Sequence, residues 1–169
     1  MTDPATTALF AAQDGDPAAF EAFILLTRRD VTAYCRYLGD ADHLDDLVQD
    51  TYLRALRSLG SFRSDSSGTR WVLSIARRAC ADAVEQHQRA RRTELTRRPV
   101  VDPTVPVDLS LLIDELAEDQ RSAFVLTQVL GHTYDEAAEM CRCPVGTIRS
   151  RVARARAALA ASAGDRRAG

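Results

Sequence analysis

Residues 133–156 read TYDEAAEMCRCPVGTIRSRVARAR, and they indicate the fold of the C-terminal half of the chain. Thr133 and Glu136 have the spacing of a capping box, in which each side chain bonds a free backbone N–H of the first helical turn. They predict a short helix that ends before residues 141–144. A longer helix follows to about Ala160, because apolar residues recur every three or four positions. Two helices joined by a tight turn are typical of a helix-turn-helix.

The longer helix has one side that anchors it and one side suited to DNA. The anchoring residues follow helical spacing: Val145, Ile148, Val152, Ala155 and Leu159. The opposite side carries the candidates for DNA contact, which are small or cationic: Thr147, Arg149, Ser150, Ala153 and Arg154. In the major groove an arginine can bridge two acceptors on guanine, and small residues allow close approach. This pattern favours DNA recognition over a merely solvated arginine-rich helix.

The middle of the chain separates two helical regions. Three prolines fall within eight residues there: Pro99, Pro103 and Pro106. Prolines this close together stop helices and favour an extended segment. Apolar residues on both sides recur with helical spacing, and no strand-like alternation of useful length occurs. The sequence therefore predicts an all-α protein with two helical domains, 8–92 and 108–163, joined by a Pro-containing flexible linker, 93–107.

The first domain shows clear helix boundaries and one polar helical face. Asp16–Pro17 is an N-cap acid followed by proline, and Gly39 is the expected end of that helix. Asp42 is the expected cap of a second helix, whose exposed face carries Asp45, Asp46, Gln49, Asp50, Arg54 and Arg57. Acids in the first turns and cations in the last suit the helix dipole, so a plain surface helix already explains them. The same face is also a candidate dock for a basic groove on another protein.

A serine-rich loop, Ser61–Thr69, precedes a third helix that is expected to begin near Trp71. The loop and this helix carry the candidates for contact with unpaired nucleic acid: Arg63, Arg70, Trp71, Ser74, Arg77 and Arg78. A tryptophan among arginines can be a platform on which unstacked bases stack. A single tryptophan in a helical bundle is also expected as a core residue, and on the residues alone this second reading is favoured.

Charge and composition exclude two kinds of chemistry and favour contact with nucleic acid. All 22 cationic residues are arginine, and without lysine the chain can build neither a P-loop nor a Schiff base. The net charge of −2 hides an alternation: −5 over residues 1–62, +5 over 63–98, −8 over 99–140 and +6 over 141–169. Two basic blocks separated by an acidic one suggest two nucleic-acid contacts on one chain.

The sequence predicts no catalytic, metal or cofactor site. The three histidines lie in separate segments, and none has the spacing of a nucleophile or metal site. The four cysteines lack zinc-site spacing, although Cys141 and Cys143 follow soon after His132, and we expect them to be reduced and buried or capping. No leader and no apolar run long enough for a membrane is apparent, so we expect a cytoplasmic protein without membrane contact.

Taken together, these motifs resemble the extracytoplasmic-function (ECF, group IV) sigma factors of bacterial RNA polymerase, in the sigma-70 superfamily. Residues 133–138 (TYDEAA) and 143–151 (CPVGTIRSR) are similar to the family's region 4 signature. Residues 45–55 (DDLVQDTYLRA) resemble its core-binding helix in region 2, and residues 71–77 (WVLSIAR) resemble its promoter-melting helix. The C-terminal domain is most similar to the actinobacterial sigma C-like group.

The resemblance implies a non-enzymatic transcription initiation factor with core RNA polymerase and promoter DNA as partners. The polar face of the second helix would bind the polymerase beta-prime clamp, and the beta flap is a further contact. The loop 61–69 and the helix from Trp71 would read and melt the −10 element, with Arg78 departing from the small polar residue usual there. The linker, with its acids, would run toward the active-site and RNA-exit path. The helix-turn-helix would read the −35 element.

Two alternatives stay open at this point. A plain helix-turn-helix regulator would bind DNA as a dimer without polymerase, but it leaves the regular second helix unexplained. A sigma factor, in turn, can be kept silent by an anti-sigma factor or by occlusion of one domain by the other. The opposite charges of residues 99–140 and of the two basic blocks allow such occlusion.

Overall fold

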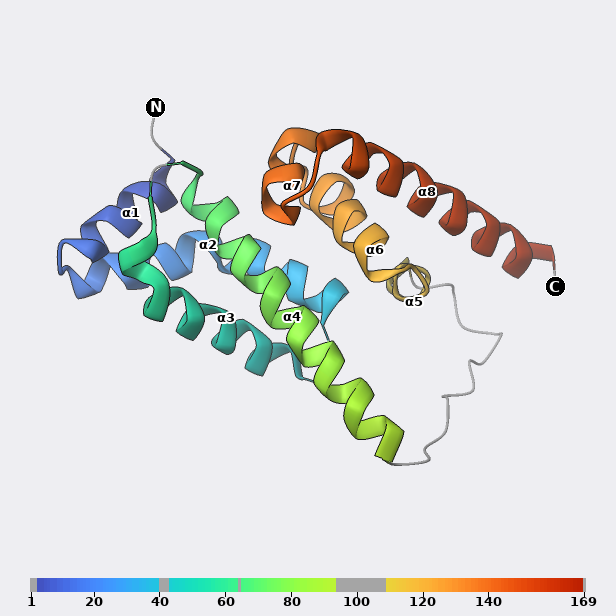
Figure 1. Ribbon diagram of the computed structural model, residues 1–169, viewed down its shortest axis with the longest axis horizontal. Helices are drawn as coiled ribbons and strands as arrows, with labels where there is room; N and C mark the ends of the chain where they lie inside the picture. Colours follow the sequence, from blue (N-terminus) through green and yellow to red (C-terminus); the bar gives the residue numbers. More distant parts are fainter. Residues whose placement is uncertain (1–2, 40–42, 64, 94–108, 169) are drawn as a thin grey trace.

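The computed structural model describes residues 3–39, 43–63, 65–93 and 109–168, and every regular element in these ranges is helical. The first four helices are α1 (Pro4–Gln13), α2 (Pro17–Leu38), α3 (Leu44–Ser58) and α4 (Gly68–Thr93), with a 3₁₀ turn η2 (Leu59–Ser61). The remaining elements are α5 (Leu109–Asp114), α6 (Glu118–Phe124), the π-helical turn η3 (Val125–Val129), α7 (Tyr134–Cys141) and α8 (Val145–Ala168). The helices form two groups, α1 to α4 and α5 to α8, which confirms the predicted all-α class with two helical domains (Figure 1).

The first group follows the expected helix signals at most boundaries. The Asp16 side chain accepts from the amide of Ala18 and caps α2, which ends at Gly39. Helix α3 begins at Leu44 with His43 at its N-cap, while the expected cap Asp42 lies outside the described residues. Helix α1 was not predicted.

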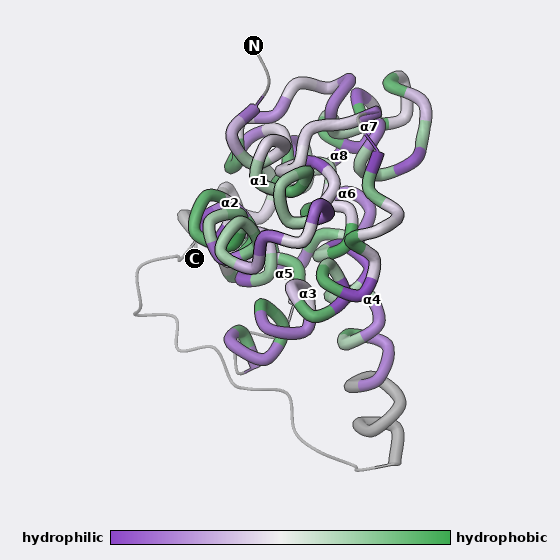
Figure 2. Tube along the Cα trace, turned by 90° about the vertical axis from the view of Figure 1, so that its left-hand side faces the viewer, coloured by the Kyte–Doolittle hydropathy of each residue, from purple (hydrophilic) through white to green (hydrophobic). Residues whose placement is uncertain are grey.

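Helix α4 lies at the centre of the first group, in contact with α1, α2, α3 and α7. It buries an apolar side made of Val72, Leu73, Ile75, Ala76, Ala79 and Cys80. Its neighbour α3 buries Leu47, Val48, Thr51, Tyr52 and Ala55. Figure 2 shows hydrophilic and hydrophobic residues alternating along these helices, as expected when one side faces a core and the other faces solvent.

The second group contains the predicted helix-turn-helix. Thr133 and Glu136 make both hydrogen bonds of the capping box at the start of α7. Arg142 ends this helix in the left-handed conformation (φ 53°), and α8 starts at Val145, as expected. It continues to Ala168, beyond the expected end.

Asp119 pairs with another helix although it lies in the first turn of α6. Helix α6 begins at Glu118, with Ala117 at the N-cap and no side-chain cap hydrogen bond. The Asp119 carboxylate instead accepts a hydrogen bond of 2.5 Å from Arg151 of α8. A charged partner from another helix therefore holds this side chain, in place of the helix's own free amides.

The two groups pack against each other in the described part of the chain. Helix α2 contacts α5, α6 and η3, and α4 contacts α7. Across this interface, the hydroxyls of Tyr34 in α2 and Ser122 in α6 are 2.6 Å apart, and both residues are buried. The expected linker 93–107 lies outside the described residues except for Thr93, so the domain boundaries stay a prediction.

The turn between α2 and α3 requires glycine at position 39. A Cβ atom there would lie 2.8 Å from the carbonyl oxygen of Cys35 and 2.3 Å from a methyl of Leu47. Gly39→Ala should therefore lower the free energy of unfolding by about 1–3 kcal/mol, because the backbone or the core must shift. Gly60→Ala is the matched control, since a Cβ at Gly60 would meet nothing within 4 Å. Equal urea midpoints for the two variants would contradict this account.

Candidate protein-docking and nucleic-acid interfaces

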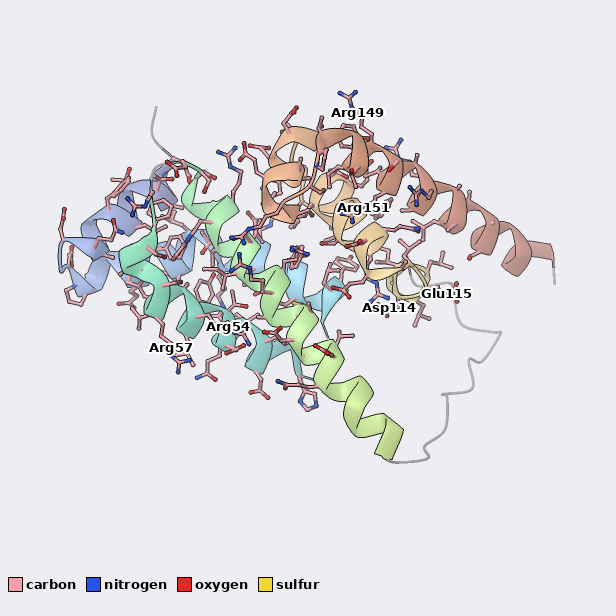
Figure 3. The ribbon with its side chains drawn as sticks, viewed as in Figure 1. Arg54, Arg57, Asp114, Glu115, Arg149 and Arg151 are labelled. Atoms are coloured by element: carbon pink, nitrogen blue, oxygen red, sulfur yellow. The ribbon has the colours of Figure 1, made fainter. Side chains whose placement is uncertain are left out.

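The polar face of α3 is exposed, as the sequence predicted. Asp45, Asp46 and Gln49 are exposed, and the Asp46 side chain is 83% accessible. Asp50 and Arg54 are half-buried, and their side chains pair with each other at 2.8 Å. Arg54 also reaches across to Asp82 of α4 at 2.5 Å, which ties α3 to α4 (Figure 3). Arg54 thus holds Asp50 in place in this conformation.

An apolar groove runs beside this acidic face, between α2 and α3. It has a volume of about 610 Å³, and its lining includes Ile24, Val48 and Tyr52 in addition to Asp45 and Gln49. Two leucines at the same groove, Leu53 and Leu56, are 44% and 50% exposed. An exposed apolar groove next to carboxylates is suited to a helix that carries both apolar and basic residues. Sequence reasoning missed the groove, because α2 supplies one of its walls.

The start of α4 carries an aromatic cluster. The ring of Trp71 lies 5.2 Å from that of Phe62 and 6.3 Å from that of Phe23. Phe62 is buried, whereas Trp71 is only half-buried. Trp71 therefore packs on the core with part of its surface and keeps another part accessible. It can serve both as a core residue and as a stacking platform for an unpaired base. Arg63, in the loop before α4, is exposed.

The other predicted residues of α4 face the second group of helices or the solvent. Arg70 lies between the groups, with its guanidinium 3.3 Å from Glu136 and 3.5 Å from Glu139 of α7. The Ser74 hydroxyl donates to the carbonyl of Trp71 at 2.7 Å, inside its own helix. Arg77 is half-buried, and its Nε finds no hydrogen-bond partner among the described residues.

The pairing of Arg70 has a direct consequence for access to α4. The guanidinium donates a hydrogen bond to Glu136 and forms an ion pair with Glu139, so two carboxylates stand where phosphate oxygens would. Arg78, by contrast, is exposed, and its pKa is lowered by partial burial and by the charges of Arg142 and Arg77. Attractive and repulsive charge contacts therefore meet where α4 contacts α7.

The outer side of α8 presents the predicted DNA-contact residues. Arg149, Ala153 and Arg154 are exposed, and Thr147 and Ser150 are half-buried. The opposite side is anchored by Ile148, Val152 and Ala155, which are at most 2% exposed. Figure 3 shows Arg149 pointing away from the body of the molecule and Arg151 pointing back toward α6. This division leaves the first turns of α8 free to enter a groove.

His132 lies at the junction of the two helix groups. It is mostly buried, and its Nε2 has no hydrogen-bond partner among the described residues. Burial is the largest cause that lowers the pKa of His132 below 6.5, and the charge of Arg70 acts in the same direction. The carboxylates of Glu136 and Asp30 oppose this shift. No sequence pattern points to this position beyond the presence of a histidine.

The described residues contain no group of three or more metal-binding side chains, and none of their helices is both long and apolar enough to span a membrane. The four cysteines are free thiols, and Cys35, Cys80 and Cys141 are buried, as predicted for small core residues.

Comparison with known families shows which family the chain belongs to. Residues 14–90 match the family "Sigma-70 region 2", and residues 107–159 match "Sigma-70, region 4". The chain is 45% identical to the ECF RNA polymerase sigma factor SigC of Mycobacterium tuberculosis, over 95% of this chain and 92% of the relative. The chain belongs to the ECF sigma factors. It is a promoter-recognising RNA polymerase sigma factor of the sigma-70 superfamily, which confirms the family and the function predicted from the sequence.

Other relatives of this sigma factor are more distant. The ECF sigma-E factor of Escherichia coli is 31% identical over 87% of each chain. The solved complex of CnrH with the cytosolic domain of CnrY has a TM-score of 0.77 at 26% identity and covers 96% of this chain and 99% of CnrH. The sigma factor RpoE of Bartonella quintana, solved with the anti-sigma factor NepR, has a TM-score of 0.71 at 30% identity, covering 83% and 93%.

The buried histidine predicts how the stability of this sigma factor depends on pH. Because the pKa of His132 is lower in the folded protein than in the unfolded chain, the unfolded chain binds the proton more readily. The contribution of His132 to the free energy of unfolding is therefore complete above its ordinary pKa of 6.5 and is lost as the pH falls below that value.

Urea unfolding of the wild type and of His132→Gln, at about pH 7.5 and about pH 5.5, tests this prediction. The wild type should lose more stability on acidification than the variant does. The same pH dependence in both proteins would show that His132 is not the group responsible.

Proposed function

We propose that this sigma factor binds core polymerase through α3, reads the −10 element through the loop before α4 and the first turns of α4, and reads the −35 element through α8. The observation that carries the proposal is that three separate surfaces, exposed or half-buried, occur in the order and with the chemistry that these three partners need. The surfaces are acidic and apolar on α3, aromatic and basic at α4, and basic with small residues on α8.

Docking on core polymerase is proposed for Asp45, Asp46, Gln49, Asp50 and Arg54. The carboxylates would meet a basic helical partner, here assigned to the beta-prime clamp, and steer its approach. The groove between α2 and α3 supports this assignment because the exposed Leu53 and Leu56 lose contact with water when a partner helix covers them. Arg54 would act by holding Asp50 in place. The beta flap is proposed as a second contact, made through the helix-turn-helix domain.

Recognition of the −10 element is proposed for Arg63, Arg70, Trp71, Ser74, Arg77 and Arg78. A half-buried tryptophan next to arginines offers a stacking face and positive charge to an unpaired strand. Arg70 takes part only after it leaves Glu136 and Glu139. The two helix groups must therefore separate when the protein engages promoter DNA.

Recognition of the −35 element is proposed for Thr147, Arg149, Ser150, Ala153 and Arg154. Exposed arginines on the first turns of a helix that follows a tight turn can reach base edges, while small neighbours permit close approach. Polymerase would set the distance between α4 and α8, and the combined recognition of the two promoter elements would give a specificity that neither helix has alone. We place this activity in the cytoplasm, together with polymerase and the chromosome.

An anti-sigma factor is proposed as a further partner. The relatives CnrH and RpoE of Bartonella quintana were solved in complexes with CnrY and with the anti-sigma factor NepR. Such a partner would compete with polymerase for the exposed apolar groove of this chain. The pairing of Arg70 with α7 offers a second way to inhibit −10 recognition, which needs no other protein.

Reversing one charge on α3 tests the core-binding proposal. Asp46→Arg should weaken co-elution with bacterial core RNA polymerase by about tenfold, because repulsion replaces attraction at the basic partner. Asp50→Arg should act in the same direction. Asp14→Arg, at an exposed site between α1 and α2, is the control and should leave binding unchanged. Undiminished binding by Asp46→Arg would count against α3 as the dock, and a dimer that binds duplex DNA without polymerase would favour the plain regulator.

Substitutions at two arginines of α8 distinguish a role in DNA recognition from a role in stability. In the holoenzyme, Arg149→Ala should weaken binding to promoter DNA selected from a random pool by about tenfold and relax base preference in the −35 element. Arg151→Ala should lower stability but keep the base preference, because Arg151 pairs with Asp119 inside the protein. Free protein should bind the same DNA weakly at physiological salt, since each domain makes few phosphate contacts. Relaxed preference for Arg151→Ala alone would reverse the assignment.

A further inference from the structure

Helix α1 binds the first residues of the loop that leads from α3 to α4. The side-chain amide of Gln13, the last residue of α1, donates to the carbonyl oxygens of Leu59 and Phe62 at 2.7 and 3.0 Å. These partners lie 46 and 49 residues further along the chain. One side chain therefore satisfies two carbonyls of a turn that has few helical bonds of its own.

The same helix holds the other end of the loop. The amide of Gly68, the first residue of α4, donates to the hydroxyl of Thr6 at 2.7 Å. A first-turn amide has no partner within its own helix, so Thr6 caps α4 from another helix. The Thr6 hydroxyl in turn donates to Asp3 at 3.1 Å, which fixes its orientation.

The approach at this second contact is close. A Cβ atom on Gly68 would lie 2.8 Å from the carbonyl carbon of Ala5 and 2.9 Å from the amide nitrogen of Thr6. Both are backbone atoms, so no larger residue fits without moving α1 or α4. Glycine at this position therefore brings the two helices into direct backbone contact.

An aromatic contact connects α1, which carries the anchoring residues Thr6 and Gln13, to Trp71, the residue on which an unpaired base is predicted to stack. The ring of Phe62 lies 5.3 Å from that of Phe10 in α1 and 5.2 Å from that of Trp71 in α4. Phe62 is 4% exposed, so it is fixed on both sides. Movement of α1 would therefore move the loop and the indole together.

The length of α1 sets the distance between the two ends of the loop. Thr6 and Gln13 are two helical turns apart, or about 10 Å along the helix axis. A helix holds this separation more rigidly than a loop can. The two ends of the loop, Phe62 and Gly68, are thus held at a fixed separation.

We propose that Thr6 and Gln13 are positioning residues for promoter recognition, and that α1 sets the geometry in which the loop and Trp71 receive an unpaired base of the −10 element. The inference rests on the proposed function of that loop. Neither residue needs to touch DNA, because each acts through backbone groups at one end of the loop.

Two variants remove the two anchors separately. Gln13→Met keeps the side chain's length and helix preference but removes both N–H donors. Thr6→Val keeps the shape but removes the acceptor for Gly68. Thr7→Val is the matched control, since the exposed Thr7 hydroxyl donates only to Asp3 of its own helix end, at 3.5 Å.

The readout is base preference in the −10 element. Holoenzymes made with each variant are incubated with forked DNA that carries a randomised single-stranded −10 stretch, and the bound fraction is sequenced. Each anchor variant should reduce discrimination between the best base and the others by about fivefold, the effect expected from one lost hydrogen-bonded anchor. Thr7→Val should match the wild type. A role in stability alone would lower the bound amount for all bases equally and leave their ratios unchanged.

The outcomes separate the inference from the function on which it rests. Unchanged base ratios in both anchor variants, with altered ratios in Trp71→Ala, would overturn the role of α1 and leave the −10 assignment intact. Unchanged ratios in Trp71→Ala as well would show that this loop and helix do not read the base at all. Core-polymerase co-elution, measured in parallel, should be unchanged for both anchor variants.

Discussion

The close packing of α4 against four other helices is the constraint on which the remaining structure depends. Small residues on its buried side, Ala76, Ala79 and Cys80, let neighbouring helices approach, while Val72 and Leu73 fill the core between them. Because α4 is fixed in this way, its first turn presents Trp71 and Arg70 at a defined place. At that turn lie the residues proposed to recognise the −10 element, the residues anchored by α1 and the residues that contact α7.

The contact between the two helix groups combines favourable and unfavourable terms. The Tyr34–Ser122 hydrogen bond is buried, and burial raises the pKa of Tyr34 well above 10, so the phenol stays neutral. Arg70 is paired with two carboxylates, but His132 Nε2 finds no partner among the described residues. Buried polar atoms without partners cost free energy, and interfaces between domains are generally polar and modest in size. Such an interface suits the separation of the two helix groups that the proposed use of Arg70 requires.

Local signals in the sequence predicted the helices well because their causes are local. The capping box at Thr133 and Glu136 and the Asp16–Pro17 start depend only on neighbouring residues. Helix α1 was missed although Asp3–Pro4 repeats the signal of Asp16–Pro17, because ten residues with few large apolar side chains give little periodicity. The pairing of Asp119 with Arg151 was not predicted, because the two residues lie 32 positions apart and no local rule indicates the contact.

The sequence by itself determined the helical class, the helix-turn-helix, the acidic face of α3 and the family, since each follows from spacing within a few turns of helix. It also placed the candidate DNA-contact residues of α8 on one side, and the structure exposes that side. Only the tertiary structure decided that Arg70 is held by Glu136 and Glu139, that α2 and α3 enclose an apolar groove, and that Thr6 and Gln13 hold both ends of one loop. These contacts join residues far apart in the chain, and their geometry depends on how whole helices pack, which periodicity does not encode.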